Sequence, residues 1–516
     1  MGSYIAGVLA GKKKTLILIG FIVAKFLLQY FLVNPEYELH RDEFLHLDQA
    51  HHLAWGYLSV PPVTSWISLI ISFLGNSVFW IRFFPSLFGA LTIVVVWKTI
   101  EELKGNLFAL ILGSTGILFS VLLRLNILYQ PNSLDVLCWT AFYFFLIRYL
   151  NSQKTKWLFL CALAFAVGFL NKYNILFALI GFLPALLLTR QRTVLVKREV
   201  GIAALLALAL ISPNLLWQYQ NHLPVFHHLK ELSDTQLVNV NRWDFVREQV
   251  LYFIGALFMI VAAFFGLLFY PPFKKYQAFF WSFFFTLSVF IYLRAKSYYA
   301  IGLYPIYVGF GAAYLGELFK VGWKKYLRPV ALILPVIAFI PIYNVGFPNK
   351  SPQYIVDHQD RYRDLGLLRW EDGKDHRLPQ DFADMLGWKE LAAKTESAYS
   401  KLPGRTLILC DNYGQAGAIN YYSKNEKIAA VSFNADYINW FDLSKRYDNL
   451  IRVKSDPPGN ELEKTGPFFE ISFDSGSITT PLSREHGTTI FIFQKAKIDI
   501  RERISDEIRE NKNRAQ

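Results

Sequence analysis

The sequence predicts a polytopic α-helical membrane protein with a small polar α/β domain at its C-terminal end. Three observations predict this fold class. The chain has 516 residues, of which 53% are hydrophobic and only 18% charged, below the roughly 25% usual in soluble domains. Apolar runs long enough to cross a bilayer recur as far as residue 344. Ordinary soluble composition follows them. A disordered chain, a coiled coil and a compact soluble enzyme are therefore poor interpretations.

The basic excess belongs to the apolar part of the chain. Residues 1–344 contain 28 Lys and Arg against 14 Asp and Glu, whereas residues 345–516 contain 25 against 26. We expect a membrane domain over 1–344 and a soluble α/β domain over 345–516. The cysteines Cys138, Cys161 and Cys410 are too few and too scattered for a disulfide scaffold or a zinc finger.

Eleven segments, most of about 17–22 residues, are predicted to span the membrane. They are residues 15–33, 78–98, 106–123, 133–150, 157–171, 174–189, 199–218, 249–270, 277–293, 300–319 and 328–344. Lys12-Lys13-Lys14 precede the first one, as in a signal peptide, but the apolar run is too long and lacks a cleavage site, so we expect an uncleaved anchor. Asn171-Lys172-Tyr173-Asn174 is expected to be a tight turn between two short spans.

The Lys and Arg bias of the loops predicts the orientation. With a cytoplasmic N-terminus, the inner segments carry eighteen Lys and Arg and the outer segments eight, which fits the positive-inside rule. An odd number of spans then places the C-terminal domain outside. Residues 62–75 are apolar but too short to span, so we expect an interfacial or re-entrant segment in the first outer loop, residues 34–77. The charge of +13 thus reports topology, and no nucleic acid partner is expected.

Acidic groups gather at the predicted outer face. Asp42 and Glu43 lie in the first outer loop, in a segment with the mixed polarity of an interfacial helix. Asp135 lies at the outer boundary of a span, where a charge is costly and normally has a partner or a function. A structural pair with Arg124 or Lys172 and a direct catalytic role are both open for Asp135.

Cations and tyrosines end several spans on the same side. Lys172 precedes Tyr173, and Arg294 and Lys296 precede Tyr298. A phosphate at the membrane boundary would explain cations retained on this face, and snorkelling is the alternative. We favour phosphate binding for Arg294 with Lys296, and snorkelling for cations farther along the loops.

Five stretches, taken in order, resemble the GT-C superfamily of membrane glycosyltransferases, in the branch of protein O-mannosyltransferases and lipid A aminoarabinose transferases. They are RDEFLHLDQAHHLAWGYLSVPP (41–62), RFFPSLFGA (82–90), GFLNKYNILF (168–177), SPNLLWQYQN (212–221) and RAKSYYAIGLYP (294–305). The segment NYGQAGAINYY (412–422) resembles the outer domain of some bacterial members.

This resemblance implies inverting transfer of a sugar from a polyprenyl-phosphate donor to a lipid, glycan or protein acceptor, on the outer face of a bacterial cell membrane. It implies that Asp42, in its pair with Glu43, is the catalytic carboxylate, which accepts the proton of the acceptor hydroxyl. Cations would stabilise the leaving phosphate, and Arg294 and Lys296 are the first candidates. The remaining candidates are Lys172 and Arg82 for the phosphate, and Asp135, Arg124 and Tyr298 as cavity or structural residues.

Two further interpretations are weighed at the first outer loop. Some relatives carry Glu-Lys before the closing proline, but this chain has Ser59-Val60 there, so a metal or sugar contact cannot be carried over. The histidines of this loop could hold a divalent ion with Asp42 and Glu43. Surface polarity is the commoner reason for such histidines, so no metal site is predicted and metal dependence stays open. They are His40, His46, His51 and His52.

Two other function classes are possible. A transporter or flippase of lipid-linked sugars is the main rival, but such proteins tend to show internal repeats and polar residues at the bilayer midplane. This chain shows no internal repeat, and its polar clusters gather at the outer boundary. A scaffold that binds partners through its soluble domain would leave Asp42 and Asp135 without a role.

The C-terminal domain shows short β-like runs at 406–410, 428–432 and 488–493, with a helix predicted over QAGAINYY (415–422). Asn412-Tyr413-Gly414 with Gly417 could bind an anion at the helix start, but two glycines are weak evidence and we favour a tight turn. Residues 499–516 are expected to form a charged helix or a frayed tail. We expect this domain to cap the cavity or to help select the acceptor, without catalytic residues of its own.

Overall fold

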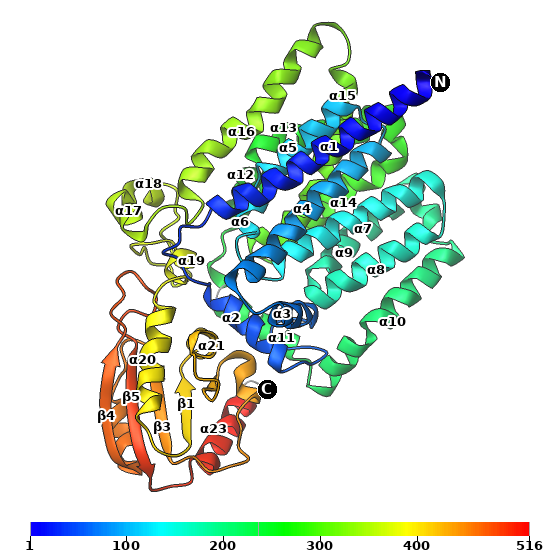
Figure 1. Ribbon diagram of the computed structural model, residues 1–516. Helices are drawn as coiled ribbons and strands as arrows, with labels where there is room; N and C mark the ends of the chain where they lie inside the picture. Colours follow the sequence, from blue (N-terminus) through cyan, green and yellow to red (C-terminus); the bar gives the residue numbers. More distant parts are fainter. Residues whose placement is uncertain (1, 236, 515–516) are drawn as a thin grey trace.

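The computed structural model describes residues 2–235 and 237–514, and most of them are helical (Figure 1). A helix forms at each predicted span, and the first one continues back through Lys12-Lys13-Lys14 because lysine is a good helix former. The helices at the predicted spans are α1 (Gly2–Phe31), α4 (Val78–Glu102), α5 (Leu107–Leu118), α7 (Asn132–Ser152), α8 (Lys156–Asn171), α9 (Leu176–Leu187), α10 (Arg198–Gln220), α12 (Arg242–Tyr252) with α13 (Leu257–Phe269), α14 (Gln277–Tyr292), α15 (Tyr304–Leu318) and α16 (Arg328–Val345).

The chain is an integral membrane protein. Among the described residues, five helical segments are long and apolar enough to cross a membrane. They are Gly11–Phe31, Val78–Glu102, Asn132–Ser152, Arg198–Gln220 and Gly322–Val345. Helices such as α5 and α8 are shorter apolar helices, so the number of eleven spans stays a prediction.

The predicted span 249–270 is wrong in one respect, because it is not a continuous helix. The chain bends by 63° between Arg242–Tyr252 and Ile254–Phe269. The backbone carbonyl of Tyr252 accepts a hydrogen bond of 3.0 Å from the N–H of Val121, outside its own helix. Beyond the bend, Gly255 lies so close to Pro335 that a Cβ atom would sit 2.8 Å from the proline Cα. Tertiary contacts therefore break this span.

Loops predicted to share a side contact one another. At the predicted inner side, Arg148 forms an ion pair of 2.6 Å with Glu102, and Lys197 donates to Gln153. The C-terminal domain lies at the end of the bundle away from the N-terminus of α1 (Figure 1). This pairing of loops agrees with the grouping that the charge bias predicts.

The first outer loop is folded against this second end. It forms α2 (Arg41–Asp48) and α3 (Val63–Phe73). Eleven helical residues rise about 16 Å, well short of the roughly 30 Å of a bilayer core. The carbonyl of Thr64 and the hydroxyl of Ser68 both contact the Tyr129 hydroxyl at 2.8 Å, so α3 packs on the end of the bundle. Further short helices in this half include α6 (Leu122–Leu125), α11 (Pro224–Thr235) and the 3-10 turn Tyr173–Ile175 at the predicted tight turn.

The C-terminal part contains one five-stranded sheet in the order β2-β1-β3-β5-β4. Strand β1 is parallel to β2 and β3, and β5 is antiparallel to β3 and β4. The strands are β1 (Thr406–Cys410), β2 (Ala430–Ser432), β3 (Asn449–Lys454), β4 (Phe469–Ser477) and β5 (Thr489–Ala496). The sequence prediction missed β3 and β4; β4 is an edge strand with mostly exposed side chains, and lacks a buried apolar face.

Helices cover both faces of this sheet. One face packs on α20 (Trp388–Ser400) and α21 (Tyr413–Tyr422), and the other on α23 (Ile500–Arg514), whose Ile500 and Ile504 are buried. Residues 499–514 are thus a packed helix from Ile500 and not a frayed tail, while 515–516 lie outside the described residues. The face with α20 and α21 shares its apolar core with Phe44 and Leu47 of α2.

The segment between α16 and the sheet packs against the bundle end. Its short helices are α17 (Pro352–Asp357), α18 (Gln359–Arg363) and α19 (Gln380–Ala383). Phe347, Ile355 and Phe382 share a core with Leu32, which directly follows α1, and with Leu123 of α6. The predicted boundary near residue 345 thus coincides with the end of α16, but the next forty residues pack with the membrane half.

Candidate active site

Asp42 lies in the first turn of α2, at the junction of the two halves. His40 caps this helix, because its imidazole accepts a hydrogen bond from the backbone N–H of Asp42. In return, the carboxylate of Glu43 accepts a hydrogen bond of 2.7 Å from the backbone N–H of His40. This reciprocal cap fixes where the helix begins. It places the Asp42 carboxylate at the positive end of the helix, which favours its ionised form.

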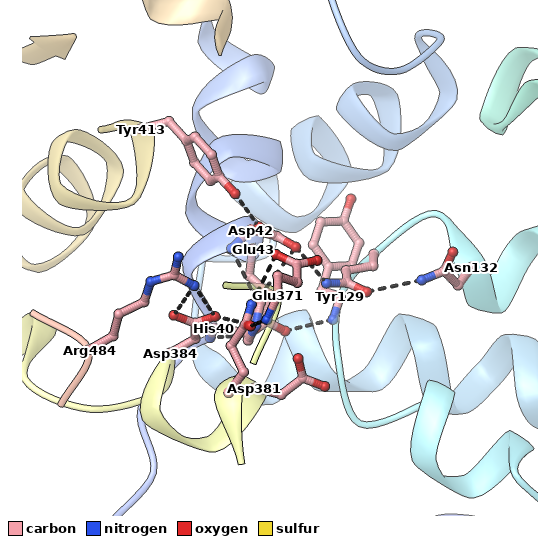
Figure 2. Close-up of polar contacts among 12 residues, drawn as sticks. His40, Asp42, Glu43, Tyr129, Asn132, Glu371, Asp381, Asp384, Tyr413 and Arg484 are labelled. Carbon is pink, nitrogen blue, oxygen red and sulfur yellow. Dashed lines mark hydrogen bonds and ion pairs between the residues drawn. The ribbon is translucent and has the colours of Figure 1, made fainter. Parts of the chain in front are cut away.

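Two side chains from distant segments hold the Asp42 carboxylate. The hydroxyl of Tyr413 donates to Oδ1 at 2.6 Å, and the amide of Gln130 donates to Oδ2 at 2.9 Å (Figure 2). Burial works to raise the pKa of Asp42, but the charges of His40 and Arg41 and the Tyr413 hydrogen bond outweigh it, so the pKa is lowered. The side chain remains 36% exposed. It is therefore an ionised carboxylate that a second molecule can reach.

A chain of hydrogen bonds links Asp42 to Lys172. After donating to Asp42, Gln130 accepts from the amide of Asn132 at 3.0 Å, and Asn132 accepts from the ammonium of Lys172 at 2.7 Å. Two neutral amides thus stand between the carboxylate and the ammonium. The opposite charges are held in one site without neutralising each other as an ion pair.

The ammonium of Lys172 rests on aromatic rings. It lies 4.3 Å from the ring centroid of Tyr299 and 5.1 Å from that of Tyr298, within the range of cation–π attraction. Within the described parts of the chain, no carboxylate lies within 4.0 Å of it. Among these residues no ion pair neutralises its charge, and burial lowers the pKa of this ammonium.

Glu43 is fully buried and holds Arg82. Its carboxylate accepts from the Arg82 guanidinium at 2.8 Å and from the backbone N–H of Tyr129 at 2.6 Å. Arg82 also donates to the backbone carbonyl of Ile127. These contacts tie α2, α4 and the segment before α7 together. The geometry pairs Glu43 and Arg82 with each other beside Asp42, with Glu43 buried and Arg82 partly exposed.

The other two predicted phosphate cations are placed differently. The ammonium of Lys296 donates to Glu371 at 2.9 Å, so its charge is paired with the segment after α16. Arg294 occupies a left-handed turn at φ 51° and is exposed. It lines an open cavity of about 450 Å³ with Arg242 and Trp243. Among the described residues it forms no ion pair, and the structure does not bring it into contact with Asp42.

The three predicted cavity or structural residues have separate partners. Asp135 accepts from Trp139 at 3.1 Å and Asn174 at 2.9 Å, so neutral donors hold it, and among the described residues it forms no ion pair with Arg124 or Lys172, the two expected partners. The guanidinium of Arg124 pairs with Asp381 at 2.7 Å, in α19. Burial, Tyr299, Asp42 and Asp381 raise the pKa of the Tyr298 phenol, which places Tyr298 in the same electrostatic field as Asp42.

The loop histidines have structural contacts. His40 caps α2, and His52 stacks on Trp440 with ring centroids 4.2 Å apart. His46 is buried beside Gln49, with 3.2 Å between its Nδ1 atom and the amide oxygen. Within residues 2–235 and 237–514, no group of three or more His, Cys, Asp and Glu side chains is arranged to hold a metal.

Sequence reasoning missed Tyr413, Gln130 and Asn132 as site residues. Tyr413 is more than 370 positions from Asp42, and the polar residues around it were interpreted as a turn or an anion site. Asn412 instead caps α21, by accepting from the N–H of Gln415 at 3.0 Å. Gln130 and Asn132 stand in the polar run that also contains Asp135, and that polar run at a span end is a signal that could have found them.

The bundle and the site together define a class of protein. It is a polytopic membrane protein with an α/β domain at one end of its apolar helices (Figure 1), and Asp42 lies where the two parts meet. The resemblance predicted from the sequence, to GT-C glycosyltransferases of the protein O-mannosyltransferase and ArnT branch, is confirmed by the following similarities.

Residues 59–217 match the family model described as dolichyl-phosphate-mannose-protein mannosyltransferase. The chain is 27% identical over 206 residues to the lipid A galacturonosyltransferase RgtD of Rhizobium johnstonii, which is 38% of this chain and 43% of that protein. The chain therefore matches less than half the length of this relative. Asp42 and Glu43 precede the residues matched by the family model.

The fold is that of ArnT from Cupriavidus metallidurans. The structure of ArnT bound to undecaprenyl phosphate aligns with a TM-score of 0.59 at 12% identity, over 94% of this chain and 98% of ArnT. The apo structure of ArnT gives the same TM-score over 92% of this chain and 97% of ArnT. This likeness includes the C-terminal α/β part, because nearly the whole chain aligns.

Proposed function

We propose that this protein is an inverting glycosyltransferase that moves a sugar from a polyprenyl-phosphate donor to an acceptor on the outer face of the cell membrane. The hydrogen-bonded chain from Asp42 through Gln130 and Asn132 to Lys172 carries this proposal. Sugar transfer from a lipid phosphate needs a base for the acceptor and a cation for the leaving group. This site contains both a carboxylate and an ammonium group, and the two amides between them hold the charges in place and separate.

The reaction follows from the two charges. The acceptor hydroxyl attacks the anomeric carbon and loses its proton to the Asp42 carboxylate, whose lowered pKa keeps it ionised. The bond between the anomeric carbon and the phosphate oxygen breaks on the opposite side, which inverts the configuration. Lys172 stabilises the negative charge that grows on the polyprenyl phosphate as it leaves.

The relatives support the donor class. ArnT is described as bound to undecaprenyl phosphate, and the matching family model is named for a dolichyl-phosphate-mannose donor. We expect the acceptor to be a glycolipid, a glycan or a protein. The names of the relatives support the first and the last of these, because they include lipid A and protein. The rival reading as a transporter or flippase predicts movement of a lipid-linked sugar without formation of a glycoside.

The test uses the full chain in proteoliposomes with a panel of undecaprenyl-phosphate-linked sugars and with lipid A, peptide and glycan acceptors. Asp42→Asn is expected to lower the transfer rate by about 10²–10⁴-fold, while the affinity for undecaprenyl phosphate is retained. Asp360→Asn is the control, because Asp360 is an exposed carboxylate on α18. Full transfer by Asp42→Asn would exclude Asp42 as the base, and flipping without glycoside formation would establish the rival function.

A further inference from the structure

The C-terminal domain places one side chain directly on the proposed base. Tyr413 is the first residue of α21, and its hydroxyl donates to Asp42 Oδ1 at 2.6 Å (Figure 2). Gln130 of the membrane half holds the other oxygen. The carboxylate is therefore fixed between the two halves of the molecule, with one donor from each.

The Tyr413 ring is itself held in place. The Arg41 guanidinium lies 4.5 Å from its centroid. The next residue, Gly414, approaches so closely that a Cβ atom there would lie 3.1 Å from the Cβ of Arg41 and 3.1 Å from the Trp388 ring. The start of α21 thus packs directly on the start of α2, which leaves the phenol little freedom to turn away from Asp42.

A buried polar seam continues this contact along α2. Asp48 accepts from Asn420 at 2.7 Å and from the Tyr437 hydroxyl at 2.6 Å. Farther on, Asp436 accepts from the side chain of Gln49 at 2.9 Å. Buried polar groups with satisfied partners specify one geometry more strongly than apolar contact does. The position of the C-terminal domain, and with it the Tyr413 hydroxyl, is therefore set by several contacts.

The titratable groups that act on Asp42 come from three elements. His40, Arg41 and His46 belong to α2 or its cap, Tyr413 comes from α21, and Tyr298 comes from the turn before α15. A hydrogen bond to a carboxylate favours its ionised form, so the Tyr413 donor acts in the same direction as the cations. It also fixes the orientation of the carboxylate.

We propose that Tyr413 is a positioning residue for the base Asp42, so that the C-terminal domain completes the active site. This inference rests on the proposed function of Asp42 as base. The domain then does more than cover the cavity. If it moved away from α2, Asp42 Oδ1 would lose its hydrogen-bond donor, and the carboxylate could rotate.

Tyr413→Phe in the full reconstituted chain tests the inference. The maximal transfer rate is expected to fall by about 10–100-fold with little change in donor KM, because the base is misplaced and the donor site is not. The acid limb of kcat/KM is expected to move up by about one pH unit, because loss of a donor raises the pKa of a carboxylate. Tyr421→Phe is the matched control, since this phenol of the same helix donates to the backbone carbonyl of Asn76.

A second measurement needs no substrate. A carbodiimide modifies protonated carboxyl groups, so mass spectrometry of the Asp42 peptide across pH reports its titration, and Tyr413→Phe is expected to move the midpoint upward. An unmoved midpoint, or an equal change in Tyr421→Phe, would overturn the positioning role. If the wild-type chain forms no glycoside with any donor, the proposed function fails, while the labelling still decides whether Tyr413 governs Asp42.

Discussion

At the scale of single residues, the site depends on keeping opposite charges apart. A direct ion pair between Asp42 and Lys172 would weaken both the proposed base and the proposed phosphate-binding cation. Gln130 and Asn132 prevent it, because their amides bond to each charge in turn. Lys296 shows the contrast, since its ammonium is already paired with Glu371. The two lysines are therefore expected to contribute unequally to donor binding.

Lys172→Gln is expected to weaken binding of undecaprenyl phosphate by about 10–100-fold, since hydrogen bonds to charged groups are worth about 1.5–3 kcal/mol. Equilibrium binding of undecaprenyl phosphate to the purified chain measures this change. The matched control is Lys156→Gln, which removes a lysine from the other end of α8 that also lies over an aromatic ring, Trp157. Unchanged affinity in Lys172→Gln would remove Lys172 from the phosphate site.

The sequence could predict the site only in part. Asp42 is marked by the resemblance to a glycosyltransferase family, because an Asp-Glu pair alone is a weak signal. Lys172 stands out as a cation at a span end, where charges are costly and few, but the sequence ranks it behind Arg294 and Lys296. Which cation is free could not be predicted, because Glu371, the partner that neutralises Lys296, lies 75 positions away in a segment of ordinary composition. The role of Glu43 as a buried support for Arg82 likewise depends on a contact across 39 positions.

At the scale of elements, the membrane half and the C-terminal domain meet where α2 packs on α21. Gly417 lies at their crossing, where a Cβ atom would sit 2.6 Å from the Cβ of Phe44 and 2.6 Å from the hydroxyl of Tyr437. Glycine is required by this close approach and not by backbone conformation. The apolar periodicity of the sequence predicted the helix, but it could not predict which of its faces meets α2.

Gly417→Ala is expected to destabilise the packing of α21 on α2 by about 1–3 kcal/mol, the usual effect of overpacking. A lower thermal midpoint and a slower transfer rate are expected together, because the same displacement moves Tyr413 away from Asp42. Gly201→Ala, on an exposed face of α10 with nothing within 4 Å of the new Cβ atom, is the control. A wild-type midpoint and rate in Gly417→Ala would show that the two helices can separate without loss.

At the scale of the whole molecule, hydrophobicity and charge predicted most of the membrane half. The spans could be placed because hydrophobic length and loop charge are local properties of the sequence. The bend at Phe253 and the strands β3 and β4 could not, because each depends on tertiary neighbours: Val121 at the bend and β5 in the sheet. The side of the membrane on which the site lies remains a prediction from charge.

Labelling from one side of the membrane tests that orientation. The three native cysteines are buried, which limits background labelling. Cysteine is introduced at Lys154, in the loop between α7 and α8, or at Lys427, in an exposed turn of the C-terminal domain. With an impermeant maleimide applied to intact cells stripped of any outer barrier, Lys427→Cys is expected to react and Lys154→Cys only after the membrane is opened. The reverse pattern would place Asp42 on the cytoplasmic face and would contradict transfer on the outer face, because α2 and the C-terminal domain share one core.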